Sequence, residues 1–246
     1  MTESWMTDSL IAKAKKYSLL IRSDLAEVLG ITEYKVRELR RELRRELARE
    51  YENSHNDDPF LAVYDLETTG LKADFGRLLC GSILSYPSGK ITTYRIDQNM
   101  GGSLNNDGQL AVAIRDEVER HWISCGYFSK GFDVSFLQTR LILNDERKIE
   151  PGLHIDPMWF YKGWRGMKLR SSSMKVVAKV LGLDEQKMDV PDAVWQAAQK
   201  ETIGTSAHTE AMDMIVDRCE SDARVTLNIM KHCLGNRLMK NIQTYP

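Results

Sequence analysis

Short apolar runs mark the part of the chain that begins at residue 60. Residues 60–64, FLAVY, form an apolar and β-prone run that is typical of a buried central strand. Two runs with alternating apolar and polar positions follow, at residues 77–86 and 90–96, and the turn-forming residues Pro87, Ser88 and Gly89 separate them. This pattern predicts a β-hairpin beside the first strand.

Helical periodicity replaces the strand pattern between residues 107 and 122. A short apolar strand is then expected near 123–128, followed by a helix that begins near Phe132. Further on, the sequence predicts a strand that ends at Asp156, a helix over 175–183 stopped by Gly182, a short helix over 192–200, and a last helix over 219–234 with Asp222 in its first turns. Strands that give way to alternating helices and strands predict an α/β layered domain.

The segment before residue 60 has a different character. Residues 51–59, YENSHNDDP, are polar and read as a loop between two domains. We therefore expect a small all-α domain over 1–52, a linker over 53–59 and an α/β domain over 60–246.

Two helices with a tight turn between them are expected in the first domain. Ser23 and Thr32 are suitable helix N-caps, and Gly30 is a suitable turn residue. Ala26, Gly30 and Val36 then have the spacing of a small contact residue, a turn residue and a branched core residue. Over about 25 residues the segment resembles the DNA-binding helix-turn-helix of bacterial regulators, which implies a DNA-binding role.

Basic residues lie along one side of the second of these predicted helices. Arg37, Arg41 and Arg45, with Lys35 nearby, flank one side of its apolar stripe, while glutamates flank the other side. Contact with DNA or RNA is one interpretation. Docking of a protein partner or of a second copy of the chain is another, and a solvated, salt-bridged helix face is a third.

Composition narrows the class of protein. The 34 Lys and Arg residues nearly balance the 35 Asp and Glu residues, which excludes a histone-like basic protein and an acidic disordered tail. No apolar run is long enough to cross a bilayer, so we expect no membrane partner and a cytoplasmic location. The four cysteines lack the spacing of a zinc site and are expected to be small core residues.

A pair of carboxylates follows the first predicted strand. Asp65 and Glu67 are two positions apart, so in an extended chain they project from the same face. Carboxylates this close repel each other unless a cation lies between them, and hard oxygen ligands select Mg²⁺ or Mn²⁺. The pair therefore predicts a divalent metal site or a solvated sheet edge. By local pattern alone, Asp133 at a helix start is a capping residue.

Three segments carry a resemblance to a known family. YDLETTGL, FSKGFDVSFLQTR and CESDARVTL resemble, in order, the three motifs of the four-carboxylate (DEDD) 3′–5′ exonuclease superfamily. The resemblance covers residues 60–235 and implies a ribonuclease H-like mixed β-sheet flanked by helices. It also implies hydrolysis of phosphodiester bonds in DNA or RNA by a two-metal mechanism, with two Mg²⁺ or Mn²⁺ ions held by Asp65, Glu67, Asp133 and Asp222.

The third motif departs from the family pattern. The family orients the attacking water with a tyrosine or histidine shortly before the last aspartate, where this chain has Arg218 and Asp217. Arg218 is therefore a candidate to contact the scissile phosphate, or to form an ion pair with Asp222. His208 is a second candidate for orienting water, from a loop expected over the small and polar residues 202–210, and its partner would be Asp213 in place of Asp222.

Further basic and aromatic residues are expected around the metal end of the domain. Lys130 is one candidate for contact with nucleic acid. Arg165, Lys168, Arg170, Trp159, Phe160, Tyr161 and Trp164 are either a single-strand binding surface or part of a packed helix or loop.

The leading hypothesis is a metal-dependent 3′–5′ exonuclease that acts on nucleic acid, with DNA favoured over RNA. A catalytically silent ribonuclease H-like module that binds nucleic acid or protein is the alternative. A transcription regulator with a ligand-sensing domain is a weaker third reading.

Overall fold

The computed structural model describes residues 10, 22–36, 38–39, 42, 61–98, 106–121, 123–149, 153–161, 169–184, 187–234 and 243–244. Within them one mixed sheet has the strand order β3-β2-β1-β4-β5-β6. Its strands are β1 (Leu61–Thr68), β2 (Leu78–Tyr86), β3 (Ile91–Arg95), β4 (Ile123–Cys125), β5 (Leu153–Ile155) and β6 (Gln243–Thr244). The predicted β-hairpin is confirmed as β2 and β3.

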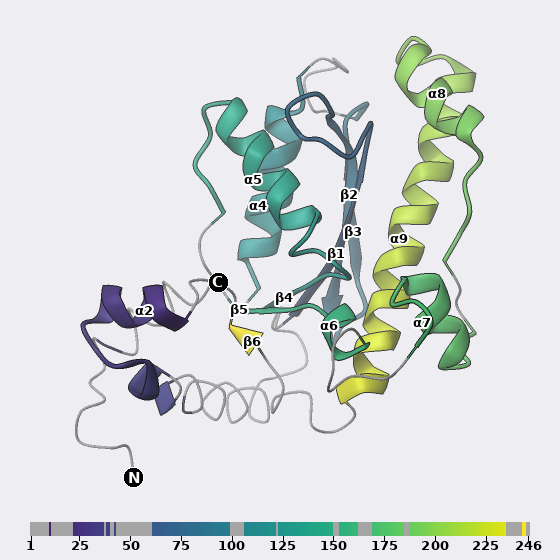
Figure 1. The fold of residues 1–246 in the computed structure, drawn as a ribbon. Helices are drawn as coiled ribbons and strands as arrows, with labels where there is room; N and C mark the ends of the chain where they lie inside the picture. The colour runs from purple at the N-terminus through teal and green to yellow at the C-terminus, as the bar shows by residue number, and fades with distance from the viewer. Residues whose placement is uncertain are drawn as a thin grey trace.

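Helices cover both faces of this sheet. They are α4 (Gly108–Glu119), α5 (Asp133–Leu143), α6 (Met158–Tyr161), α7 (Met174–Val180), α8 (Asp192–Lys200) and α9 (Ser206–Leu234). Figure 1 shows α4 and α5 on one face and α9 along the other. The predicted α/β layered domain, a mixed sheet flanked by helices, is confirmed.

Strand β1 is central and longer than its parallel neighbour. It pairs antiparallel with β2 over its whole length, but its parallel pairing with β4 ends at Val63 and Cys125. Residues Tyr64–Thr68 therefore extend beyond the carboxyl end of β4. In α/β sheets this edge is where ligands usually bind.

Alternation along β1 divides the core into two layers. Ala62, Tyr64 and Leu66 pack with α4 and α5, whereas Leu61 and Val63 pack with residues of α9. Side chains of a strand alternate between its faces, so Asp65 and Glu67 continue the α9 side. Each fully buried leucine of such a core contributes about 1.5–3 kcal/mol to folding.

Helix α9 is longer than the sequence suggested. It runs over 29 residues from Ser206, so Asp222 lies about four turns inside it and the prediction that Asp222 occupies the first turns is wrong. The small and polar residues 202–210 predict a loop, but α9 already begins at Ser206. The buried Ala211, Met212 and Ile215 hold this end of the helix against the core.

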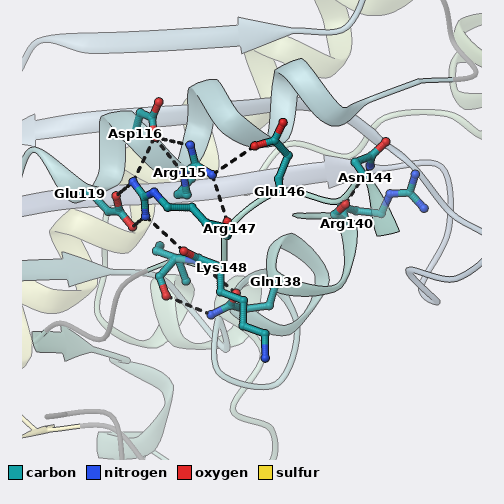
Figure 2. A network of polar contacts seen from close by, with 10 residues as sticks. Arg115, Asp116, Glu119, Gln138, Arg140, Asn144, Glu146, Arg147 and Lys148 are labelled. Carbon is teal, nitrogen blue, oxygen red and sulfur yellow. Dashed lines mark hydrogen bonds and ion pairs between the residues drawn. The ribbon is translucent and has the colours of Figure 1, made fainter. Parts of the chain in front are cut away.

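Two sets of polar contacts fix α4 against α5. In the first, the buried Arg140 forms an ion pair with Asp107 (2.7 Å) and donates to the carbonyl of Ala73 (2.9 Å). The second lies at the other end of α4, where Arg115 and Arg147 bridge α4 and the segment that follows α5 (Figure 2). Arg140, the arginine in the second family-like segment, therefore has a structural role here.

The described part of the N-terminal segment contains a helix, a turn and the start of a second helix. Helix α2 (Arg22–Leu29) is followed by Gly30, whose φ of +64° explains why a glycine stands there. Thr32 Oγ1 accepts a hydrogen bond from the Lys35 N–H (3.3 Å), and Ala26 packs with the fully buried Val36. A DNA-binding helix-turn-helix domain over 1–52 remains a prediction, because Arg37, Arg41, Arg45 and the linker lie outside the described residues.

Among the residues that the structure describes, none of the helices has both the length and the apolar character needed to span a bilayer.

Candidate active site

Three carboxylates meet beyond the carboxyl end of β4. Asp65 and Glu67 project from β1, and Asp222 approaches from α9. One ligand oxygen of each lies within 4.8 Å of the other two, and Asp222 is only 1% exposed. Residues more than 150 positions apart in sequence thus form one acidic cluster, as a metal site requires.

Asp133 lies beside this cluster at the start of α5. Its Oδ1 accepts a hydrogen bond from the N–H of Leu66 (3.1 Å), the residue between Asp65 and Glu67. Asp133 is 4% exposed and does not belong to the group of three within 4.8 Å. Of the four predicted metal ligands, the structure therefore brings three together and holds the fourth against their strand.

The loop before Asp133 is fixed by residues of β5 and its end. Asp156 accepts hydrogen bonds from the N–H groups of Phe128 (2.9 Å) and Met158 (3.1 Å). His154 bridges the hydroxyls of Ser124 (2.6 Å) and Ser129 (2.7 Å). These contacts hold Phe128 at a φ of +58°, a conformation that costs a non-glycine residue energy, and so determine where α5 begins.

Glycine is needed at position 126 of the same loop. A Cβ atom there would lie 2.6 Å from the Cβ of Ser129, too close for any side chain. The same Cβ atom would lie 3.2 Å from the backbone carbonyl oxygen of Tyr64, so the loop also passes close to β1.

Burial raises the pKa of every acid in the cluster. For Asp65 it raises the pKa well above the ordinary value, with a further rise from the charges of Glu67, Asp133 and Asp222. Burial raises the pKa of Glu67 to about 7 although Arg218 opposes the shift. Burial also raises the pKa of Asp133 to about 7, against the hydrogen bond from Leu66, and raises that of Asp222 against the charge of Lys187. Such raised pKa values are expected where several carboxylates are buried close together without a metal ion between them.

Two cationic side chains reach into the cluster. Lys187 Nζ lies 2.5 Å from Asp222 Oδ2, and Arg218 Nε lies 2.9 Å from Glu67 Oε1 and 3.9 Å from Asp222 Oδ2. The contact of Arg218 with Glu67 lacks hydrogen-bond alignment. Glu67 Oε1 and Asp222 Oδ1 are therefore buried oxygens without a hydrogen-bond partner among the described residues.

These unpartnered oxygens test whether the residues suit a metal ion. Buried carboxylate oxygens cost free energy unless hydrogen bonds or a cation compensate them. An all-oxygen set of donors fits Mg²⁺ or Mn²⁺ and is unsuited to softer metals. The donor set therefore fits a hard divalent ion, with Asp65, Glu67 and Asp222 as its ligands.

A sulfur atom lies directly behind the cluster. Cys219 Sγ donates a hydrogen bond to the backbone carbonyl of Asp65 (3.2 Å), one helical turn before Asp222. Cys80, Cys125 and Cys219 are buried free thiols, which agrees with their expected role as core residues, while the side chain of Cys233 lies outside the described residues.

An open pocket of about 330 Å³ adjoins Glu67. Its wall includes the polar and charged side chains of Lys187, Gln199 and Arg218 together with the aromatic rings of Phe132 and Trp195. The guanidinium carbon of Arg218 lies 5.2 Å from the centre of the Trp195 ring, so Arg218 links the aromatic wall to Glu67.

Several residues singled out from sequence lie elsewhere. His208 belongs to the first turn of α9 and is fully buried near Asp97, about 20 Å along the helix from Asp222. The loop expected over 202–210 is therefore limited to residues 202–205. Asp213 forms an ion pair with Arg95 (2.5 Å), away from the cluster. His208 cannot orient water at this cluster without unfolding the start of α9.

The expected basic and aromatic surface is only partly described. Lys130 lies half-buried in the loop before Asp133, and its carbonyl accepts a hydrogen bond from Ser135. Trp159 is 41% exposed, whereas Tyr161 is a core residue. Arg165, Lys168, Trp164 and the side chain of Phe160 lie outside the described residues.

Sequence reasoning missed Lys187, Trp195 and Gln199. The lysine is 35 positions before Asp222 in a polar segment, and nothing in its neighbourhood indicates a partner. The amphipathic pattern of 192–200 predicts a helix, but it does not tell which of its exposed side chains face a pocket.

Comparison with known proteins gives a family and a fold. The model of the RNase_H superfamily matches residues 62–234. The family B DNA polymerase from the hyperthermophilic archaeon Pyrobaculum calidifontis is similar in structure, with a TM-score of 0.52 and 12% identity. The match covers 76% of this chain and 27% of the polymerase, so the chain spans about a quarter of that protein's length.

A second solved structure, described as the apo form of the nuclease, matches with a TM-score of 0.45 and 15% identity over 80% of this chain and 78% of that one. No curated protein matches the sequence.

Proposed function

The chain belongs to the RNase H superfamily, and from this premise we propose that it is a metal-dependent 3′–5′ exonuclease. Membership in this superfamily supports a nuclease-type function. The observation that carries the finer proposal is the buried acidic cluster of Asp65, Glu67 and Asp222 beside a pocket of about 330 Å³.

Four carboxylates have distinct tasks in this proposal. Asp65, Glu67 and Asp222 hold divalent ions, and Asp133, fixed by the N–H of Leu66, completes the set with its remaining oxygen. Two Mg²⁺ or Mn²⁺ ions, when bound, supply the positive charge that stabilises attacking and leaving oxygens in an in-line displacement at phosphorus. The protein fixes the ligand geometry beforehand through β1, α5 and α9.

Arg218 and Lys187 take the role of phosphate ligands. Each contacts a carboxylate that the proposal assigns to metal ions, so each would become available to a phosphate group if metal ions took over the charge of Glu67 and Asp222. A guanidinium and an ammonium at the edge of the cluster then lie next to the position of the scissile phosphate. Arg218 stands where the superfamily's exonuclease motif has a water-orienting residue, and a phosphate contact preserves substrate alignment there.

The pocket beside the cluster is large enough for a small ligand such as one nucleotide residue. Small-molecule sites span about 300–1,000 Å³, and this pocket has a volume of about 330 Å³. DNA is the favoured substrate. The N-terminal helices would bring the enzyme to it, or would bind a protein partner or a second copy of the chain.

A catalytically silent nucleic-acid or protein-binding module is the second candidate. The observation that favours it is the pairing of Lys187 with Asp222 and of Arg218 with Glu67, because both acids then have counter-charges without any metal ion.

One assay separates the two candidates. Purified protein is incubated with 3′-labelled single- and double-stranded DNA and RNA in Mg²⁺, Mn²⁺ or EDTA, and the products are resolved by size. An exonuclease releases labelled mononucleotides only with the metal ion, and Asp222→Asn abolishes the release. Asp213→Asn, on the same helix but paired with Arg95, is the matched control and retains activity. Binding without hydrolysis of any substrate supports the silent module.

A further inference from the structure

A chain of buried hydrogen bonds runs from β5 to the loop before α5. Its centre is His154 on β5, which is 2% exposed. Nδ1 of His154 lies 2.6 Å from the Ser124 hydroxyl on β4, and Nε2 lies 2.7 Å from the hydroxyl of Ser129 in the loop. Polar side chains in a core need hydrogen-bond partners, so these three groups constrain one another.

The directions of these hydrogen bonds follow from the single proton of the Ser129 hydroxyl. That proton is donated to the backbone carbonyl of Gly126 (2.9 Å), so the same oxygen accepts a hydrogen bond from Nε2–H of His154. Burial lowers the pKa of His154 to about 3, so its ring is neutral at pH 7 and Nδ1 accepts the proton of Ser124. One tautomer of His154, with its hydrogen on Nε2, therefore satisfies all three side chains.

Ser129 connects this chain of hydrogen bonds to the metal-site candidates. Its side chain is fully buried, and its backbone carbonyl accepts the N–H of Val134 (2.9 Å), the residue after Asp133. The carboxylate of Asp133 in turn accepts the N–H of Leu66 on β1 (3.1 Å). A shift of Ser129 therefore moves the start of α5, and with it the fourth predicted ligand.

The register of the sheet explains why this loop matters. The parallel pairing of β1 with β4 ends at Val63 and Cys125, so the N–H of Leu66 is bonded by a side chain instead of a strand. Beyond that point the loop after β4 carries α5 onto β1, and His154 anchors the loop from the neighbouring strand β5.

We propose that His154 is a positioning residue for the metal site: through its Nε2–H bond to Ser129 it sets the place of the Asp133 carboxylate beside β1. This inference rests on the proposed nuclease function, since that function assigns Asp133 to a divalent ion. His154 acts through Ser129 and does not itself bind the ion. Removing a residue that orients a metal ligand typically lowers metal affinity by about 10- to 100-fold.

A matched pair of variants separates the two nitrogens of the ring. The side chain of glutamine is long enough to place an amide nitrogen at the position of Nε2, whereas that of asparagine reaches only the position of Nδ1. His154→Gln therefore keeps a donor for Ser129, and His154→Asn loses it while keeping a partner for Ser124. Ser124→Ala is the control, because it removes the other partner of the same ring.

The first measurement needs neither a metal ion nor a substrate. Amide hydrogen exchange of Leu66, followed by NMR in EDTA, reports whether the Asp133 carboxylate still accepts its N–H. Leu78, whose N–H is bonded to the buried Asp107 carboxylate (2.8 Å), is the internal control. In His154→Asn the exchange of Leu66 should be about tenfold faster or more while that of Leu78 is unchanged, and His154→Gln should match the wild type.

Equal acceleration of the two amides in His154→Asn means that the histidine only stabilises the fold, and overturns the proposal. Unchanged exchange of Leu66 in that variant overturns it as well.

Titration calorimetry with Mn²⁺ is the second measurement. His154→Asn and Ser129→Ala should weaken Mn²⁺ binding by about 10- to 100-fold, while His154→Gln and Ser124→Ala should leave it near the wild-type value. An equal loss of affinity in Ser129→Ala and Ser124→Ala contradicts a role that runs through Ser129, and so does an unchanged affinity in His154→Asn.

The results distinguish a failed positioning role from a failed nuclease. Metal-dependent hydrolysis that is unaffected by His154→Asn leaves the nuclease standing and overturns the positioning role. Faster exchange of Leu66 and weaker Mn²⁺ binding in His154→Asn, with no hydrolysis of any substrate by the wild type, keep the positioning role and overturn the exonuclease.

Discussion

Lys187 occupies the position beside Asp222 that a metal ion would need. At 2.5 Å the two groups share a charge-assisted hydrogen bond, and the lysine is the counter-charge of a carboxylate that is only 1% exposed. Binding of a divalent ion to Asp222 therefore competes with this ion pair.

Replacing this lysine should strengthen metal binding. In Lys187→Met the ion no longer displaces an ammonium group. A hydrogen bond to a charged group is worth about 1.5–3 kcal/mol, so we expect Mn²⁺ to bind roughly tenfold or more tightly at pH 8. Titration calorimetry with Mn²⁺ measures this directly.

Lys175→Met is the matched control for this prediction. Lys175 forms an equally short ion pair with Asp189, but both side chains are more than half exposed and Asp189 is not in the acidic cluster. Mn²⁺ affinity should not change in this variant. Unchanged or weaker Mn²⁺ binding in Lys187→Met would show that Lys187 does not compete with the metal ion for Asp222.

The raised pKa values predict an unusual pH dependence. Burial raises the pKa of Glu67 and that of Asp133 to about 7, so between about pH 4.5 and pH 7 the folded, metal-free protein binds protons that the unfolded chain has released. The free energy of unfolding from these two groups therefore falls as pH rises through this window. His154 acts in the opposite direction, because burial lowers its pKa to about 3.

A comparison with Glu67→Gln separates the contribution of Glu67 to the pH dependence of stability from that of His154. In EDTA, the wild type should lose stability relative to this variant between pH 5 and pH 8, since only the wild type has a carboxyl group to deprotonate at position 67. The gain in melting temperature on adding Mg²⁺ should also be larger at pH 8, where protons no longer compete for the carboxylates. If the difference in melting temperature between the wild type and Glu67→Gln does not change with pH, the pKa of Glu67 is not raised as stated.

Sequence reasoning singled out the acids of the site and Arg218 but missed the other polar groups around them. Asp65 and Glu67 are recognisable because a strand projects alternate residues from one face. Lys187 and Gln199 have no such signal, because each meets the site only through the packing of α8 and the preceding loop against α9. Tertiary contacts of this kind leave no local pattern in a single sequence.

At the scale of elements, Arg140 joins α5 to α4 and to the loop after β1. Its guanidinium is bound to Asp107, which is fully buried and also accepts a hydrogen bond from the N–H of Leu78 in β2 (2.8 Å). One ion pair thus ties two helices and the strand next to β1 into a single unit.

Arg140→Met should therefore destabilise the fold strongly. The variant leaves the Asp107 carboxylate buried without its cation, and removing one partner of a buried pair costs about 3–5 kcal/mol. Urea denaturation measures the loss. Arg147→Met is the control, because its pair with Glu119 is half exposed and its removal should cost no more than about 1 kcal/mol. Similar losses in the two variants would mean that burial does not govern these pairs.

Helix α9 shows where reasoning from local composition fails. The small and polar residues 202–210 favour a loop, yet residues 206–210 are helical and the buried Ala211, Met212 and Ile215 follow them at helical spacing. Packing against the sheet outweighs the local preference. The hairpin β2–β3 was predictable because its turn residues and its alternation agree with each other.

At the scale of the whole molecule, the described sheet and its helices account for the site without the N-terminal segment. Every residue of the acidic cluster and of the pocket lies between Asp65 and Asp222. The proposed contribution of residues 1–52 is to engage a larger substrate or a partner, a task separate from hydrolysis.

Deletion of residues 1–52 should separate these two tasks. Hydrolysis of a short oligonucleotide should proceed at nearly the wild-type rate, whereas affinity for long duplex DNA should fall, because the basic residues Arg37, Arg41 and Arg45 are gone. Single-turnover assays and gel-shift titrations measure the two quantities. If the truncated protein retains its fold by circular dichroism but no longer hydrolyses the short substrate, residues 1–52 are needed for hydrolysis and the prediction is wrong.

The thiol of Cys219 gives the molecule a built-in reporter of local opening. Burial and the neighbouring Cys80 raise the pKa of this thiol well above its usual range, so the reactive thiolate is almost absent while α9 lies on β1. A thiol reagent can modify Cys219 only when α9 moves away from β1 and exposes the thiol. A metal ion that bridges Asp65 and Asp222 would fasten the helix to the strand, so the rate of Cys219 labelling measures how firmly the two are joined.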